Sequence, residues 1–149
     1  MERKDTEITA PAGSYESLMA AIQGGADSVY FGAGQLNMRS ASSINFQPED
    51  LRKIATICRD NGLKSYLTVN VVIYDSEKEQ MERIIDTAKE SGINAIIASD
   101  ISAIGYAFRQ GIEVHLSTQL NISNADALRF YSQYGDVAVL ARELNLDQV

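Results

Sequence analysis

The sequence is poor in cysteine and lacks long apolar runs. Cys58 is its only cysteine, which excludes an internal disulfide and any metal or iron–sulfur site built from several cysteines of this chain. No apolar run approaches the roughly 18 residues of a membrane span. Met1–Asp5 leads into no apolar signal segment. We therefore expect a cytoplasmic protein with one domain over residues 1–149, without metal ligands or membrane contact.

Basic charge is also scarce. The chain has 13 Lys and Arg against 20 Asp and Glu, a formal net charge of −7. A surface broadly devoted to nucleic-acid phosphates would favour a basic balance, so this class of surface is disfavoured, although a local basic pocket is compatible with the sequence. Hydrophobic residues make up 45% of the chain, which is ordinary for a globular domain with a sizeable core.

Glycines punctuate the chain in a regular way. Each of a set of glycines follows a segment of helical periodicity and precedes a short apolar run: Gly25, Gly62, Gly92, Gly111 and Gly135. A glycine in this position is typical of a helix C-cap. Their spacing averages about 27 residues, near one βα unit of a (β/α)8 barrel of about 250 residues. The pattern predicts a partial TIM barrel of about six parallel strands, incomplete at the C-terminus.

The expected elements follow this unit. Helix starts are expected at Ser14, Pro48, Asp75 or Ser76, and Asn124, where capping or first-turn residues stand. Residues 35–47 form the longest loop. The tail, residues 144–149, stops where a sixth helix should begin. Strands are expected over Glu7–Ala10, up to Gly32–Gly34, over Lys64–Ile73, up to Ser99–Asp100, over Glu113–Leu120 and up to Ala141–Glu143.

Two of these strands are polar on one face. Tyr66, Thr68 and Asn70 alternate with apolar residues in the third strand, and a longer set alternates in the fifth: His115, Ser117, Gln119 and Asn121. A central strand of an open parallel sheet is covered on both faces and is usually apolar on both. In a barrel, helices cover only the outside. The alternation favours the barrel over a doubly wound sheet, with these polar faces directed inward.

Ligands of barrels bind among the loops that follow the strands, so residues at the predicted C-terminal strand ends are the site candidates. Amides and guanidinium groups recognise carboxylates, carbonyls and hydroxyls. No metal-ligand cluster and no nucleophile–base pair is specified by the sequence. The candidates for substrate binding are Arg39, Asn70, Asp100, Gln119, Asn121, Arg142 and Glu143.

Each candidate has a structural alternative. Asp100 is equally suited to capping the following helix. Arg142 and Glu143 are adjacent, so we expect only one of them to point inward. Gln119 and Asn121 are the strongest candidates, since buried amides need partners. His115 is better explained as an interior histidine than as a catalytic one, and Cys58 as inert core.

A set of motifs, in order along the chain, resembles the N-terminal half of the collagenase-like peptidase family, peptidase family U32. The resemblance implies a barrel and a reported protease activity of no settled catalytic type. Several members are similar to hydroxylation factors for tRNA, rRNA or ubiquinone precursors, some of which use prephenate or an iron–sulfur cluster. The motifs are Ala10–Gly13, Gly25–Gly32, the Arg39 loop, Val69–Asn70, Ser99–Asp100, His115–Gln119 and Ala141–Leu144.

The cysteine-rich signature of the family lies beyond the end of this chain, so the resemblance transfers no catalytic residue to it. The expected function is the N-terminal part of a U32 barrel enzyme, a collagenase-like protease or a tRNA/rRNA hydroxylation factor, acting on peptide or RNA and inactive as a fragment. The alternative is a non-catalytic half-barrel that assembles with a missing C-terminal half or a second chain. Any cofactor would be held outside this chain.

Overall fold

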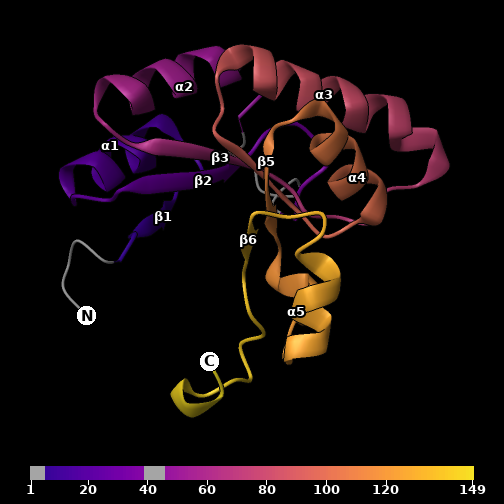
Figure 1. The fold of residues 1–149 in the computed structure, drawn as a ribbon. Helices are drawn as coiled ribbons and strands as arrows, with labels where there is room; N and C mark the ends of the chain where they lie inside the picture. Colours follow the sequence, from indigo (N-terminus) through magenta and orange to yellow (C-terminus); the bar gives the residue numbers. More distant parts are fainter. Residues whose placement is uncertain (1–5, 39–45) are drawn as a thin grey trace.

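The computed structural model describes residues 6–38 and 46–149. It contains one curved sheet of parallel strands whose spatial order follows the chain (Figure 1). The predicted half-barrel is thus confirmed. The strands are β1 (Thr9–Pro11), β2 (Ser28–Gly32), β3 (Lys64–Val69), β4 (Ala95–Ala98), β5 (Glu113–Leu116) and β6 (Val137–Ala138).

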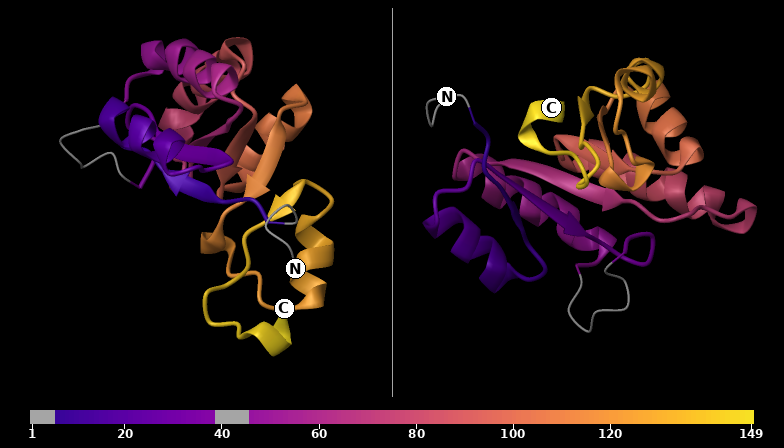
Figure 2. Two further views of the ribbon diagram at one scale, coloured as in Figure 1. Left: turned by 90° about the vertical axis from the view of Figure 1, so that its left-hand side faces the viewer. Right: turned by 90° about the horizontal axis from the view of Figure 1, so that it is seen from below.

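Helices α1 to α4 run along the convex side of the sheet and leave its concave side open (Figure 1). Helix α5 and the segment after β6 project beyond the end of the sheet (Figure 2). The helices are α1 (Tyr15–Gln23), α2 (Leu51–Asp60), α3 (Lys78–Ser91), α4 (Ile101–Gln110) and α5 (Ala125–Tyr131). Short 3-10 turns are η2 (Pro48–Asp50), η3 (Asp75–Glu77), η4 (Thr118–Leu120) and η5 (Leu146–Gln148).

The apolar core lies between the convex face of the sheet and the helices. Alternate strand residues such as Phe31, Leu67 and Ile96 are fully buried against helix residues such as Leu51 and Ile85. Each such side chain contributes about 1.5–3 kcal/mol through burial. The polar residues between them in β3 and β5 are therefore turned to the concave side.

The helix–glycine–strand unit recurs as predicted through Gly111. Gly92 (φ 86°) and Gly111 (φ 69°) are left-handed C-caps of α3 and α4, a conformation that favours glycine. Gly135 has another role, because α5 ends at Tyr131 and its C-cap is Ser132. A Cβ at Gly135 would lie 2.6 Å from the Leu116 side chain, so this glycine permits close approach of the chain to β5.

Several strand ends differ from the sequence prediction. β3 ends at Val69 instead of Ile73, and β6 ends at Ala138 without reaching residues 141–143. β5 ends at Leu116 instead of Leu120 because the chain turns into η4. The Ser117 hydroxyl accepts a hydrogen bond from the Gln119 backbone N–H and caps this turn. The alternation of the fifth strand therefore stops at Ser117.

The inner face of α4 is formed by two alanines and one isoleucine. Ile101 and Phe108 are more than half exposed, and the buried face consists of Ala103, Ile104 and Ala107. None of the helices in the described part of the chain is both long and apolar enough to cross a bilayer.

Candidate ligand site on the concave face

A cavity of about 600 Å³ occupies the concave face of the sheet. The predicted inward direction of the polar faces of β3 and β5 is confirmed, since both line this cavity. It lies within the size range of small-molecule sites. Its lining includes Tyr30, Tyr66, Thr68, Asn70, His115 and Ser117.

The register of the paired strands brings the aromatic rings of the concave cavity together. Tyr30 of β2 is paired with Tyr66 of β3, which is paired with Ala95 of β4. The Tyr66 and His115 rings meet across β4, with centroids 4.5 Å apart and planes at 60°. The small side chain of Ala95, which lies in register between Tyr66 and Glu113, leaves room for this contact.

A hydrogen-bonded cluster forms the end of the cavity nearest the strand N-termini. The Tyr66 hydroxyl donates to Glu7 Oε1 at 2.5 Å, and Lys64 Nζ lies 3.1 Å from Glu7 Oε2. Burial by itself raises the pKa of Glu7, but hydrogen bonds from Tyr66, Ser28 and Lys64 outweigh it and lower the pKa from 4.5 to about 2. Burial and the bond to Glu7 raise the pKa of Tyr66. Glu7 is therefore a carboxylate and Tyr66 a neutral phenol at neutral pH.

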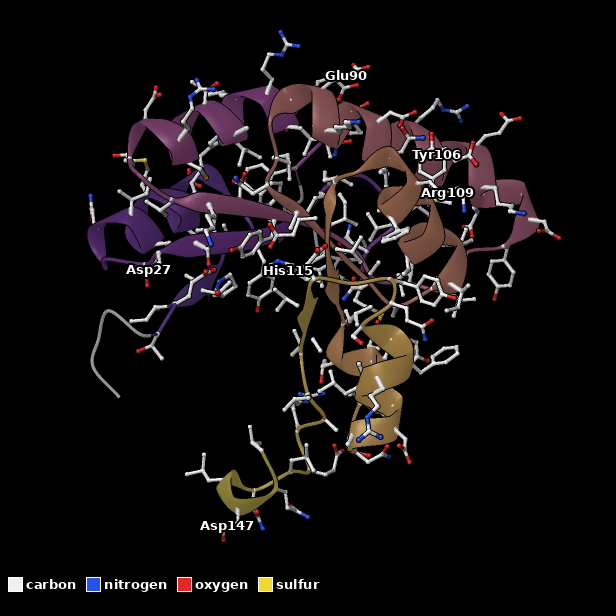
Figure 3. The ribbon with its side chains drawn as sticks, in the orientation of Figure 1. Asp27, Glu90, Tyr106, Arg109, His115 and Asp147 are labelled. Atoms are coloured by element: carbon white, nitrogen blue, oxygen red, sulfur yellow. The ribbon has the colours of Figure 1, made fainter. Side chains whose placement is uncertain are left out.

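His115 is held beside this cluster from its own strand. Its Nε2 lies 2.8 Å from Glu113 Oε1, and its side chain is only 9% exposed. In Figure 3 it lies on the concave side, away from α2 and α3. A purely structural interior histidine would have hydrogen-bond partners for both ring nitrogens. Among the described residues, His115 has a partner for Nε2 only.

A second pocket, of about 360 Å³, lies at the C-terminal ends of the strands. It brings together three of the predicted candidates, Asn70, Asp100 and Gln119, with the apolar side chains of Met38 and Val72. Asn70 also lines the larger cavity. This amide therefore stands at the boundary between the two spaces.

Both carboxylate oxygens of Asp100 have structural partners. Oδ1 accepts from the Ser102 backbone N–H at 2.8 Å and from its hydroxyl at 2.6 Å. Oδ2 accepts from the Ile73 backbone N–H at 3.1 Å. Burial by itself raises the pKa of Asp100, and these hydrogen bonds lower it below its usual value. The helix-capping alternative is confirmed, and the same side chain fixes the loop after β3.

Asn70 performs a comparable function for the segment after β2. Its Oδ1 accepts from the Met38 backbone N–H at 3.3 Å. Its amide nitrogen has no hydrogen-bond partner among the described residues. Two donor hydrogens are therefore left for an acceptor in the pocket.

The candidates Asn121, Arg142 and Glu143 line neither of these two pockets. Asn121 is exposed and left-handed (φ 51°) at the end of η4, and Gln119, although it lines the smaller pocket, is exposed as well. The expectation that these two amides are buried on a strand face is wrong, because β5 ends before them. Arg142 and Glu143 are both exposed on the segment after β6. Arg39 lies outside the described residues.

The described residues do not fit an iron–sulfur cluster. They contain no group of three His, Cys, Asp or Glu side chains placed to hold a metal. Cys58 is buried in α2, as predicted, and burial raises the pKa of its thiol to about 11, so it is protonated. A dicarboxylate such as prephenate needs cationic partners. Lys64, the described cation that lines the larger cavity, is paired with Glu7.

The sequence prediction did not include Glu7 in the site, and it placed Tyr66 and His115 on the inward faces without naming them as site candidates. For Glu7 the available signal is its spacing from Thr9, since both line the cavity at a period of two. The contact of Glu7 with Tyr66 joins residues far apart in the chain, and no local pattern reports such a contact.

Comparison with known proteins adds to this geometry. Residues 13–149 match the model of Peptidase family U32. The chain is 66% identical over 149 residues to a collagenase of Porphyromonas gingivalis, covering all of this chain and 36% of that relative. It is 34% identical over 143 residues to tRNA hydroxylation protein P1 of Bacillus subtilis, covering 94% of this chain and 34% of that relative.

A further relative is 23S rRNA 5-hydroxycytidine C2501 synthase of Escherichia coli, 33% identical over 144 residues, with 96% of this chain and 22% of that protein covered. The chain thus spans about a third or less of the length of these relatives.

Two solved structures share the fold. The U32 peptidase Mk0906 superimposes with a TM-score of 0.73 at 11% identity, covering 91% of this chain and 58% of that chain. The tryptophan synthase alpha chain of Legionella pneumophila gives a TM-score of 0.59 at 18% identity, with 97% and 64% covered. At these identities the likeness concerns the arrangement of strands and helices alone.

Proposed function

This chain belongs to peptidase family U32, as its ordered motifs indicated, and from that membership we propose that it forms the N-terminal part of the substrate site of a barrel enzyme that hydroxylates a nucleobase in tRNA or rRNA. Such an enzyme acts in the cytoplasm. The relatives named as tRNA hydroxylation protein P1 and rRNA 5-hydroxycytidine synthase support this proposal.

The observation that carries the proposal is the lining of the concave cavity. Tyr30, Tyr66 and His115 offer ring surfaces, and Asn70 and Ser117 offer hydrogen-bonding groups, around one space of about 600 Å³. Enzymes that modify a base take it out of its stack and hold it against aromatic faces while polar groups read its edges. The cavity has the size and the composition for this task.

The charge of the chain restricts the rest of the RNA contact. With a net charge of −7, the phosphates need basic groups gathered locally or supplied by another part of the enzyme. Arg39 and Arg142 stay the candidates for such contacts in this chain. The described residues fit neither an iron–sulfur cluster nor prephenate.

Peptide hydrolysis is the second candidate, and the 66% identity to the P. gingivalis collagenase favours it. The described residues support this reading less. Ser117 and His115 line one cavity, but no hydrogen bond joins them. A serine nucleophile requires such contact with its base.

The deciding experiment is deletion of the gene in the source organism, followed by mass spectrometry of nucleosides from total tRNA and rRNA. We expect one hydroxylated nucleoside to disappear, and to return with the wild-type gene and with the control Gln80→Ala on the exposed side of α3. Asn70→Ala should restore it incompletely.

Purified protein is tested in parallel on gelatin and casein. An unchanged nucleoside profile together with proteolysis that Asn70→Ala reduces would establish the peptidase in place of the hydroxylation factor. An unchanged profile without proteolysis would refute both.

A further inference from the structure

We propose that His115 determines which base the cavity accepts, because its Nδ1 accepts a hydrogen bond from an exocyclic amino group of the ligand. The inference rests on the proposed function and names the group of the nucleobase that the chain reads. It also gives His115 a role that the sequence did not favour.

The Nε2 nitrogen of His115 carries a hydrogen, which determines the role of Nδ1. His115 Nε2 lies 2.8 Å from Glu113 Oε1. A carboxylate oxygen only accepts hydrogen bonds, so Nε2 carries the hydrogen in this contact. In a neutral imidazole the second nitrogen, Nδ1, is then an acceptor.

The orientation of the His115 ring is fixed by its neighbours. The His115 side chain is 9% exposed and its ring packs against Tyr66, with centroids 4.5 Å apart. Tyr66 is fixed in turn by its hydrogen bond to Glu7. With one edge bonded to Glu113 and one face against Tyr66, the ring presents Nδ1 in a defined direction. Such preorganisation strengthens discrimination between ligands.

The Nδ1 atom of His115 is accessible to a ligand in the cavity. It makes no hydrogen bond with any described residue. Within the described part of the chain, no fully buried side-chain nitrogen or oxygen lacks a partner. An unpartnered Nδ1 in this buried residue must therefore be reached by solvent, and His115 lines the concave cavity. Nδ1 is thus an acceptor that the cavity exposes.

The neighbouring groups define the ligand class. The Thr68 hydroxyl donates its hydrogen to the Phe31 carbonyl oxygen at 3.0 Å. The Asn70 amide nitrogen has donor hydrogens for a ligand, and His115 Nδ1 is an acceptor. A flat ring that carries an amino group beside a ring nitrogen or carbonyl acceptor satisfies both. Cytosine has this pattern, because its amino group lies next to the N3 acceptor, and adenine shares it, whereas uracil carries no amino group.

The direct test uses the fact that His115 is the only histidine of the sequence. In the 149-residue chain labelled with ¹⁵N-histidine, long-range ¹H–¹⁵N spectra report this residue alone. We expect a proton on Nε2, a bare Nδ1, and a shift of the Nδ1 signal when cytidine is added. N4,N4-dimethylcytidine, which lacks the amino hydrogens, should leave the signal in place. A proton on Nδ1, or equal responses to the two nucleosides, would overturn the inference.

A matched pair of variants tests the role in the cell. His115→Gln keeps a donor for Glu113 but removes the acceptor at Nδ1, whereas His115→Asn keeps a polar atom near Nδ1 and loses the Glu113 contact. In the deletion strain we expect His115→Gln to restore the hydroxylated nucleoside about tenfold less well than wild type, and His115→Asn to restore more. Thermal melts of both proteins identify any loss of folding.

Two outcomes in the deletion strain separate the role of His115 from the hydroxylation of the nucleobase. If deletion removes no hydroxylated nucleoside, the function is wrong. If the wild-type gene restores the nucleoside and His115→Gln restores it equally, the function stands and the assignment of His115 is wrong.

Discussion

Glu7 shows how one residue links stability to pH. Its folded-state pKa of about 2 lies below the ordinary value of 4.5, so its stabilising contribution is complete above about pH 4.5 and is lost as the pH falls towards 2. We expect the melting temperature of Glu7→Gln to lie below that of wild type at pH 7 and to converge with it near pH 2. Melts at several pH values measure this. Tyr66→Phe, which removes the main hydrogen bond, should reduce the pH dependence in the same window.

Asp100 is the residue at which the site and the fold depend on the same atoms. Asp100→Ala removes the N-cap of α4 and the bond to the Ile73 backbone N–H. We expect a loss of about 1–2 kcal/mol in the free energy of unfolding, measured by urea denaturation. Glu143→Ala, at an exposed position, is the control and should stay within about 0.5 kcal/mol. Equal effects of the two changes would show that the capping contacts contribute no stability.

At the scale of elements, the turn after β5 separates site residues from structural ones. Asn121 is left-handed at the end of η4, a conformation that costs alanine about 1–2 kcal/mol and glycine little. We expect Asn121→Ala to destabilise the protein and Asn121→Gly to be nearly neutral. Gln119→Ala should not change the melting temperature, and Leu116→Ala, in the core, should cost about 2–5 kcal/mol. Melts of the four variants decide, and equal melting temperatures for the two Asn121 variants would contradict the argument.

The same turn shows what the sequence could predict. Alternation identified the inward faces of β3 and β5 correctly, because burial of Leu67 and Val114 on one side requires the polar residues to lie on the other. Alternation did not locate the strand ends. They depend on single hydrogen bonds, such as the one between the Ser117 hydroxyl and the Gln119 N–H, and a polar residue continues an alternating pattern whether or not the strand continues.

The candidate site was predictable to a similar extent. Asn70, Asp100 and Gln119 meet in one pocket because the C-terminal ends of neighbouring parallel strands share one edge of the sheet. The cluster at the opposite end was not predictable, since Glu7 reaches Tyr66 and Lys64 from another strand. Periodicity assigns a face to each residue, whereas contacts across a sheet require the strand order and register.

For the whole molecule, the two outer strands determine the expected behaviour in solution. Among the described residues, β1 and β6 each pair with one neighbouring strand only, and Val137 in β6 and Val139 just after it are more than 40% exposed. Unpaired strand edges favour pairing with another chain. We expect the 149-residue chain alone to form larger species in size-exclusion chromatography as its concentration rises. Pro11 in β1 lacks a backbone donor, so β6 is the more favourable edge.

A lysine introduced at Val139 tests that edge, because a charge beside an open strand opposes pairing. Val139→Lys should shift the elution of the concentrated protein towards the monomer. Gln80→Lys makes the same change in charge on the exposed side of α3 and should not shift the elution. Wild-type protein that stays monomeric at every concentration would show that the open edges do not drive association. Only Val139→Lys alters the strand edge that a further barrel strand or a second chain would cover. Equal shifts by the two variants would therefore identify net charge, and not the edge, as the cause.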